Sequence, residues 1–470
     1  MQQTFSSLYQ RMRKWGRHLR DALSTTHVIA LGFLSAILIG TLLLMLPICA
    51  ADHQTTPLID CLFTATTCVC VTGLTTVTTA VHWSLIGKII LLILIQLGGL
   101  GIVSFTTGIM MIIGRKITLR DRLLLEDALN LDTLSGLVRF LRRIFAGTFL
   151  IEGLGAIGYC FVFIPEYGVL RGLWYSVFHS VSAFCNAGID LLGDSSLVAY
   201  ATNPWMNFVT MALIIMGGLG FIVWWDILCV FRAIRDREFT GRQFFKKLHL
   251  HSKIVLLTTA VLLIFGTVLI FLLEYHNDAT IGTMTPPQKL LAAAFESVTL
   301  RTAGFFTFPQ SGLRDSTVVL SLPLMLIGGS SIGTAGGIKT TTIALLFASA
   351  LAAAKGTDSV ILFKRRISHK TIQKAMAVTL ISVVVLFAAI MSLSIVQPGN
   401  LLDITFEATS AIATVGLSRD FTGSLHFAGK FIIILCMYLG RIGPISLAIF
   451  FNSRKKPAFI TYPQEDVTVG

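Results

Sequence analysis

Charged residues are scarce in this chain. Only 13% of its 470 residues are Asp, Glu, Lys or Arg, while 54% are hydrophobic, and soluble domains carry about 25% charged residues. No sizeable soluble domain is therefore expected. Apolar runs of about 20 residues, long enough to cross the ~30 Å hydrocarbon layer of a bilayer, occur at 28–48, 85–113, 144–164, 206–230, 254–273, 316–350, 375–396 and 427–451. The sequence predicts an all-α protein that crosses the membrane several times.

Metal-binding and catalytic patterns are also missing. Cys68 and Cys70 do not form a CxxC motif, and no histidines stand at metal-ligand spacing from the eight cysteines. Glu152, Asp190 and Asp226 fall at different helix depths, so they offer no cluster for an intramembrane enzyme. We expect no enzyme activity and no covalently bound cofactor, and we interpret the cysteines as small apolar residues.

The net charge of +13 comes from basic residues whose placement argues against a nucleic acid partner. They gather before the first apolar run and in every second connection after it. The positive-inside rule places these segments, and both termini, in the cytoplasm. No cleavable signal peptide is expected, because the basic N-terminus leads straight into a full-length apolar run.

A short stretch that ends in a glycine turn recurs four times between the apolar runs. The glycines are Gly73, Gly188, Gly304 and Gly416, at intervals of 115, 116 and 112 residues, and each stretch opens with a Phe. Stretches of about 10–14 residues are typical of re-entrant segments rather than spans. Irregular backbone at membrane depth must be buried in protein or line a water-filled path. Four such stretches therefore predict a central pore.

The residues around the four glycines suit a bare cation. Glycine readily adopts positive φ, and rings of carbonyl oxygens can replace the hydration shell of potassium. The re-entrant helices would also direct their negative C-terminal ends at the axis. Thr-Val-Gly in the fourth stretch matches the start of a potassium-channel filter. We predict a filter built from Val71, Thr72, Gly73, Asn186, Ala187, Gly188, Thr302, Ala303, Gly304, Thr414, Val415 and Gly416. The alternative is that these glycines serve only close helix packing.

The four stretches are not identical. Nine residues lead from Phe295 to Gly304, against ten in each of the other stretches. Glu296 and Glu407 follow the Phe in the third and fourth stretches, where the first two have Thr64 and His179. The two glutamates either add cation affinity or cap backbone amides behind the filter, and we favour the structural role.

The apolar runs after the four turns also align, as QLGGLGI, IMGGLGF, LIGGSSIG and YLGRIGP. The fourth contains Arg441, and an arginine inside a span normally faces a cavity or a partner. Arg441 would lie roughly 20 Å along its helix, below the filter, and act as a barrier to cations. The alternative is that its side chain extends to the cytoplasmic headgroups.

The third run is interrupted by GGSSIGTAGGIKTTT at 328–342. This segment cannot form a straight helix, and we predict that it is a gate that blocks the pore or moves. The predicted gate residues are Gly328, Gly329, Ser330, Ser331, Gly333, Thr334, Gly336, Gly337, Lys339 and Arg441. A passive kink is the alternative.

Together these features predict four pseudo-symmetric repeats of outer helix, re-entrant pore loop and inner helix around one central pore. The repeats span 27–114, 144–231, 254–350 and 375–451, the third with a broken inner helix. The expected cytoplasmic segments are 1–26, 115–143, 232–253, 351–374 and 452–470.

The motifs CVTGL, NAG, RTAGF and TVGLS, with the break at 328–342 and Arg441, resemble those of the Trk/Ktr/HKT superfamily of potassium transporters. The chain is most similar to the membrane subunit (KtrB type) of the bacterial Ktr system, over nearly its whole length. The resemblance implies potassium uptake across the bacterial plasma membrane by a homodimer with one pore per subunit, gated by the broken helix and Arg441. It also implies a cytoplasmic ring of nucleotide-binding, RCK-type (KtrA-like) regulatory subunits, which would contact 125–140.

The alternative to a selective potassium pathway is a coupled carrier. A secondary carrier that couples potassium to sodium or protons, with a less selective filter, would need membrane-embedded carboxylates, and few lie away from the loops. Sodium dependence of uptake is equally open. Arg419, just after the fourth turn, departs from the family pattern of small residues. A positive charge there would weaken potassium binding unless Asp420 neutralises it.

Overall fold

The computed structural model describes residues 25–113, 117, 123–125, 136–236, 243–357 and 359–443. The expected cytoplasmic tail 452–470, nearly all of the segment 1–26 and most of the contact segment 125–140 lie outside the described residues, as does the end of the last apolar run. The described chain is helical apart from one small hairpin of β1 (Ile361–Leu362) and β2 (Arg365–Arg366). The predicted all-α class is confirmed.

Four long helices are apolar enough to cross a membrane, and each begins a repeat. They are α2 (Thr25–Leu44), α8 (Leu137–Tyr167), α13 (Leu250–Glu274) and α17 (His369–Val396). Large apolar side chains on them face outward, such as Phe161, 68% exposed, and Phe387, 66% exposed. A soluble protein rarely exposes such a surface, whereas a bilayer covers it.

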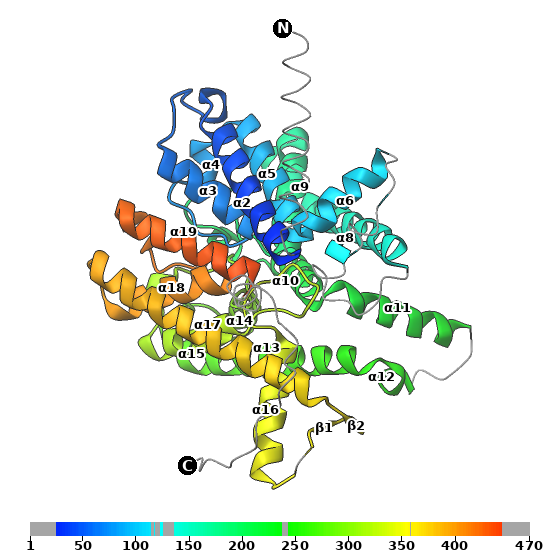
Figure 1. The fold of residues 1–470 in the computed structure, drawn as a ribbon. Coiled ribbons are helices and arrows are strands. Elements are labelled where there is room, and N and C mark those ends of the chain that lie inside the picture. The colour runs from blue at the N-terminus through cyan, green and yellow to red at the C-terminus, as the bar shows by residue number, and fades with distance from the viewer. Residues whose placement is uncertain are drawn as a thin grey trace, which may run out of the picture.

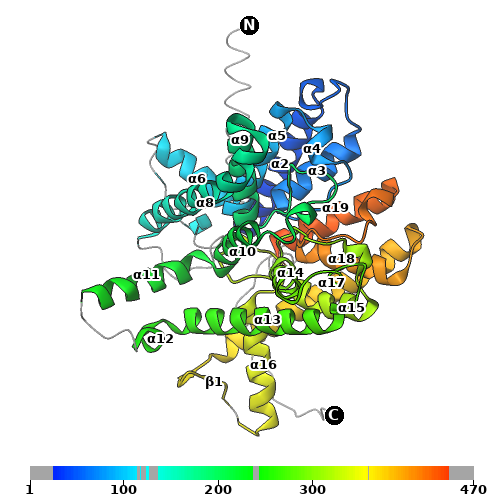
Figure 2. The ribbon, with the colours of Figure 1, turned by 180° about the vertical axis from the view of Figure 1, so that it is seen from behind.

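Each outer helix is followed by a shorter helix that packs against it. These pore helices are α3 (Leu58–Cys70), α9 (Val169–Cys185), α14 (Pro286–Thr299) and α18 (Leu401–Ala413). In the view from behind, α9 and α3 lie above α14 and α18 (Figure 2). Local sequence starts two of them: Pro286 occupies the first position of α14, and the Asn400 side chain accepts a hydrogen bond from the Leu402 N–H at the start of α18.

The inner helices are α5 (Leu85–Leu100), α10 (Pro204–Leu219), α15 (Asp315–Leu326) and α19 (Phe427–Ile442). Three of them continue after a break as α6 (Ile102–Ile112), α11 (Phe221–Arg235) and α16 (Thr340–Ala354). These three second halves, α6, α11 and α16, point outward from the middle of the molecule in three different directions (Figure 1). Short helical turns complete the described elements: η1 (Pro47–Cys49), α4 (Thr79–His82), η2 (Val198–Tyr200), α12 (Phe244–Lys247), η4 (Gln310–Gly312) and η5 (Thr422–Ser424).

The inner helices correct one expectation. The runs 85–113 and 206–230 were expected to be continuous helices and only the third to be broken, but α5 and α6 meet at 103° and α10 and α11 at 98°. Gly101 (φ 80°, ψ 137°) and Gly220 (φ 88°, ψ 144°) form these bends. Gly443, which ends α19, has the same conformation, with φ 88° and ψ 147°. Only glycine adopts this backbone region without strain.

Candidate functional site

The segments after the four pore helices share one backbone conformation. Each begins with a left-handed residue, and the glycine two positions later again has positive φ, while the residue between does not. The first residues are Val71, Asn186, Thr302 and Thr414, with φ of 56°, 60°, 69° and 53°, and the glycines are Gly73, Gly188, Gly304 and Gly416, with φ of 105°, 63°, 84° and 93°. These segments contain the twelve residues predicted to form a filter, and after that prediction they are together named the filter ring. Four chemically different sequences thus adopt one geometry.

The four segments close into a ring. A β-carbon built on Gly73 would lie 2.7 Å from the carbonyl oxygen of Ala187. The same contact runs from the second segment to the third, from the third to the fourth and from the fourth back to the first: Gly188 to Ala303 at 2.7 Å, Gly304 to Val415 at 2.7 Å and Gly416 to Thr72 at 2.1 Å. Each glycine therefore packs against the neighbouring segment around one axis. A residue with a side chain would clash with that segment, and it would be strained at the positive φ of the glycine.

A hydroxyl side chain holds each segment from behind, a feature that the sequence analysis missed. Thr67 accepts a hydrogen bond from the Gly73 N–H at 2.9 Å, and Ser410 accepts one from the Gly416 N–H at 3.0 Å. In the second and third repeats the hydroxyls bond one residue after the glycine: the Ile189 N–H donates to Ser182 at 3.1 Å, and Thr299 donates to the Phe305 carbonyl at 2.5 Å. All four hydroxyls lie four residues after the Phe that opens each stretch, so alignment of the stretches would have found them.

The two glutamates next to those Phe residues face the segments that follow the filter ring. Glu296 accepts a hydrogen bond from the Gln310 side-chain amide at 3.1 Å. Glu407 accepts one from Ser418 at 2.7 Å and a second from the Thr422 hydroxyl. Both carboxylates are buried. Their partners are side chains, whereas the structural role that the sequence analysis favoured is the capping of backbone amides, so that role stays a prediction.

Several polar side-chain atoms of the filter ring are buried without a hydrogen-bond partner in the described part of the chain. They are the hydroxyls of Thr72, Thr302 and Thr414 and the side-chain amide of Asn186. A buried polar group without a partner costs about 1–3 kcal/mol, so such groups normally meet water or an ion. Their gathering at one ring indicates a hydrated axis rather than a dry core.

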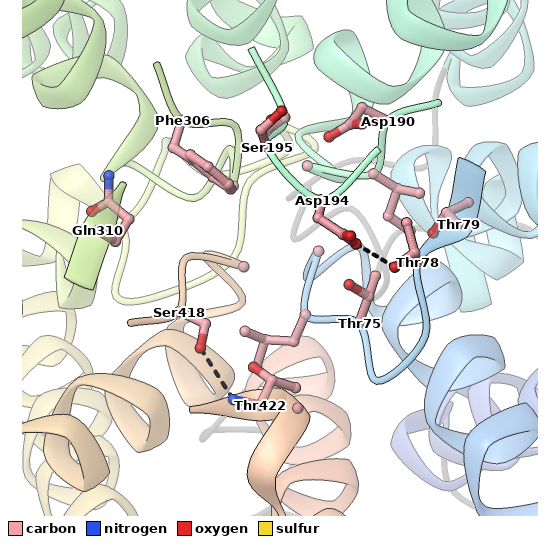
Figure 3. Close-up of a pocket in the computed structure, with 18 of the residues that line it drawn as sticks. Thr75, Thr78, Thr79, Asp190, Asp194, Ser195, Phe306, Gln310, Ser418 and Thr422 are labelled. Atoms are coloured by element: carbon pink, nitrogen blue, oxygen red, sulfur yellow. Dashed lines mark hydrogen bonds between the residues drawn. The ribbon is translucent and has the colours of Figure 1, made fainter. Parts of the chain in front are cut away.

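On one side, the filter ring opens into a cavity of about 570 Å³, the vestibule, which all four ring glycines line (Figure 3). Three carboxylates, those of Asp190, Asp194 and Asp420, also line it, and the Thr78 hydroxyl donates a hydrogen bond to Asp194. Burial raises the pKa of Asp190 to about 6. Its negative charge is therefore lost as the pH of the adjoining solution falls through 6. At higher pH the vestibule attracts cations.

Arg419 does not place a free positive charge at this vestibule. Its guanidinium lies 2.6 Å from the carboxylate of Asp403, in the first turn of α18, and its side chain is only 11% exposed. The residue that neutralises Arg419 is thus Asp403, and not the neighbouring Asp420, which lines the vestibule. Asp403 is the partner because the chain after the fourth filter segment runs back past the start of its own pore helix.

On the other side of the filter ring lies the broken part of the third inner helix. Hydrogen bonds from the Gly328 N–H to the Ile338 carbonyl (3.0 Å) and from the Ile338 N–H to the Leu326 carbonyl (2.9 Å) close the neck of a loop, the 328–338 loop. A β-carbon on Gly336 would lie 1.9 Å from the Thr414 hydroxyl oxygen, and one on Gly328 would lie 3.1 Å from the Thr302 methyl carbon. The loop therefore lies directly against the filter ring.

The tip of the 328–338 loop binds the bend between α10 and α11. The Ser330 N–H donates to the Gly218 carbonyl at 2.8 Å, the Thr334 N–H donates to the Gly217 carbonyl at 3.1 Å, and the Phe221 N–H donates to the Ile332 carbonyl at 2.9 Å. All three bonds join backbone groups. The bend at Gly220, which the sequence analysis did not predict, supplies the groups on the α10–α11 side.

Arg441 reaches across the axis to two other repeats. Its guanidinium donates to the Thr334 carbonyl of the 328–338 loop at 2.6 Å and to the Gly98 carbonyl of α5 at 2.5 Å. A side chain held in this way does not extend to the headgroups, so that alternative is excluded. Lys339 instead bonds within its own segment, to the Ala335 carbonyl at 2.7 Å.

Three of the four inner helices touch the pore helix of their own repeat at a glycine that recurs in the aligned inner helices. A β-carbon on Gly98 would lie 2.3 Å from the Val69 carbonyl oxygen. In the second and fourth repeats the contacts are equally close, from Gly217 to Phe184 and from Gly440 to Ile412, at 2.0 Å each. The third repeat lacks this contact, because Gly328 faces the Gly336 carbonyl oxygen at 2.1 Å instead.

Known proteins resemble this chain over most of its length. The profile of a family described as "TrkH: Cation transport protein" matches residues 5–460. The potassium/sodium uptake protein NtpJ of Enterococcus hirae is 40% identical, over 97% of this chain and 99% of the relative. The Ktr system potassium uptake protein B of Bacillus subtilis is 39% identical, over 94% of this chain and 96% of the relative. The crystal structure of the potassium transporter TrkH from Vibrio parahaemolyticus shares the fold, with a TM-score of 0.73 over 92% of this chain and 86% of that chain at 15% identity.

Proposed function

The chain belongs to the TrkH family of cation transport proteins, and on that premise we propose that it takes up potassium across the plasma membrane through the filter ring. The observation that carries the proposal is the closed contact of each ring glycine with the next segment's carbonyl, from Gly73 around to Gly416. Four equivalent segments around one axis can offer their carbonyl oxygens in place of water around a potassium ion. The acidic vestibule supplies cations to this ring.

The 328–338 loop and Arg441 form the gate in this proposal. The loop lies against Thr302 and Thr414 on the side of the ring away from the vestibule, where it obstructs the axis. Arg441 bonds the loop to the first repeat and places a fixed positive charge in the path of a cation. The proposed gate residues remain those predicted from the sequence, of which Gly328, Gly336 and Arg441 make the contacts that support the role most directly.

We also propose a topology and partners for the chain. Both termini and the basic connections face the cytoplasm of a bacterial cell, so the vestibule faces the outside. The chain acts as the ion-translocating subunit of a regulated complex, as a homodimer with a nucleotide-binding ring of the RCK type on its cytoplasmic side. The Bacillus relative's name, which assigns it to a Ktr system, supports membership in a larger system.

Sodium enters the proposal through another relative. The Enterococcus hirae protein is named a potassium/sodium uptake protein. Sodium is therefore the second ion to test, either as a transported ion or as one whose gradient supports potassium uptake.

The test is potassium uptake in bacterial cells that lack their own potassium uptake systems. Wild-type protein should restore growth at low external potassium, and tracer uptake should favour potassium over sodium. Gly304→Ser should lower this preference, because a β-carbon there would meet the Val415 carbonyl at 2.7 Å. Protein in the membrane fraction is measured in parallel. Wild-type protein that is present in the membrane but carries no potassium would refute the proposal.

A second prediction concerns the Arg419–Asp403 pair at the edge of the vestibule. Asp403→Asn leaves the Arg419 charge uncompensated, so the external potassium concentration at half-maximal uptake should rise about threefold, which matches the small energy of partly exposed ion pairs. The rise should shrink at high ionic strength. The control is the double variant Asp403→Asn, Arg419→Gln, which removes both charges and should return close to wild type. An unchanged half-saturation in Asp403→Asn would show that the pair does not affect ion entry.

A further inference from the structure

Arg301 is a buried cation for which the proposed function has no role so far. It is 7% exposed and directly precedes the third filter segment. The corresponding residues of the other repeats are Cys70, Cys185 and Ala413, all small and uncharged. In the described part of the chain, no carboxylate lies within salt-bridge distance of Arg301, and its Nε has no hydrogen-bond partner.

A charged side chain inside a membrane protein is expensive and normally has a specific partner. The partner of Arg301 is the carbonyl oxygen of Gly328, which its Nη2 meets at 3.0 Å. Gly328 is also the residue whose N–H closes the neck of the 328–338 loop on Ile338. Arg301 thus joins the residue before the third filter segment to the neck of the loop.

This contact replaces one that the other three repeats make without a side chain. There, an inner-helix glycine lies against a carbonyl near the end of its own pore helix, as Gly98 does against Val69. In the third repeat the loop separates the inner helix from the pore helix, and Gly328 faces Gly336 instead. There the side chain of Arg301 bonds the Gly328 carbonyl.

The two ends of the 328–338 loop are held differently. The tip is held by backbone bonds to Gly217, Gly218 and Phe221, by the Thr334 hydroxyl, which donates to the Phe184 carbonyl of α9, and by Arg441 from another repeat. The neck is held by backbone bonds within its own segment and by Arg301 from the same repeat. A bond from a charged donor is stronger than one between neutral groups, so the Arg301 bond is the strongest single one at the neck.

We propose that Arg301 is a positioning residue that fixes the neck of the 328–338 loop to the third filter segment, so that this segment keeps its place when the tip moves. The inference rests on the proposed function, because it assigns selectivity to the ring and gating to the loop. Substitutions at the neck should therefore change ion selectivity, whereas substitutions at the tip should change the rate of transport alone.

The experiment measures potassium and sodium uptake per molecule by the full-length protein in liposomes. Arg301→Gln should lower the ratio of potassium to sodium uptake about tenfold. Arg301→Lys keeps the charge and one donor group that can reach the Gly328 carbonyl, so its ratio should lie between those of Arg301→Gln and wild type. Arg441→Ala, at the tip, should keep the wild-type ratio. The matched control is Arg314→Gln, which also removes an arginine bond to a backbone carbonyl, that of His276, but at an exposed site; it should behave as wild type.

A wild-type ratio in Arg301→Gln, at any transport rate, would overturn the inference. If Arg301→Gln does not reach the membrane, Arg301→Lys decides: a lowered ratio supports the inference, and a wild-type ratio overturns it. The proposed function fails in a different way, when wild-type protein in the same liposomes shows no preference for potassium at all.

Discussion

Gly416→Ala should lower the ratio of potassium to sodium uptake by at least about tenfold, because Gly416 is the most crowded glycine of the filter ring. A β-carbon there would lie 2.1 Å from the Thr72 carbonyl oxygen, and the residue has φ of +93°. The Thr72 carbonyl must turn or move to make room, and a carbonyl displaced from the ring no longer replaces a water of the ion. Gly416→Asp adds a larger side chain and a charge, so its loss should be at least as great. Tracer uptake of both ions, per molecule in the membrane, measures the effect.

Gly423→Ala is the matched control for this substitution. Gly423 lies in the same repeat and lines the same vestibule, but nothing lies within 4 Å of a β-carbon built on it. It should transport as wild type does. If the Gly416 variants do not reach the membrane, Gly73→Ala is measured instead, with a contact of 2.7 Å to Ala187. A wild-type ion preference in a ring variant that reaches the membrane would remove the filter from the mechanism.

Arg441→Ala should raise potassium uptake about tenfold. The substitution removes one bond to the 328–338 loop and one to α5. A hydrogen bond from a charged group contributes about 1.5–3 kcal/mol, and every 1.4 kcal/mol changes an equilibrium about tenfold. The loop should therefore leave the axis more often, and the positive charge that repels a passing cation is also gone. The initial rate of uptake, normalised to protein in the membrane, measures the change.

The control for Arg441→Ala is Arg366→Ala, which removes the same charge from the exposed hairpin of β1 and β2. It should leave uptake unchanged, so that a rise in Arg441→Ala reflects the position of the charge and not the net charge of the protein. Lower uptake by Arg441→Ala at a normal protein level would mean that Arg441 assists passage of the ion instead of hindering it.

The repeated glycine turns allowed the architecture to be predicted, because four copies of a pattern within one sequence can be aligned with one another. The hydroxyls of Thr67 and Ser410 occupy matching positions in the same alignment, four residues after the Phe of each stretch, so the sequence contains the signal for them as well. The bends at Gly101 and Gly220 stand at matching glycines of QLGGLGI and IMGGLGF, but the hydropathy of the two runs does not show them. Hydropathy responds to side chains, whereas these bends depend on backbone angles within a run that stays apolar on both sides.

Long-range partners were the least predictable part of the site. Asp420 is next to Arg419 in sequence, yet the ion pair forms with Asp403, which lies 16 residues earlier. Arg301 is 27 residues away from the Gly328 carbonyl that it binds. In both cases the partner follows from where the chain returns after a turn, and residue types alone do not contain that information.

The bend at Gly220 has a consequence for how the protein changes shape. In an uninterrupted α-helix the Phe221 N–H would pair with the Gly217 carbonyl, four residues back. Both groups are instead bonded to the 328–338 loop, through Ile332 and Thr334. The loop thus competes with the helix for the same hydrogen-bonding groups. Backbone groups at membrane depth cannot stay unpaired. If the loop withdraws, the Phe221 N–H and the Gly217 carbonyl are therefore favoured to pair with each other. Departure of the loop is thus thermodynamically linked to straightening of α10 and α11 into one continuous helix.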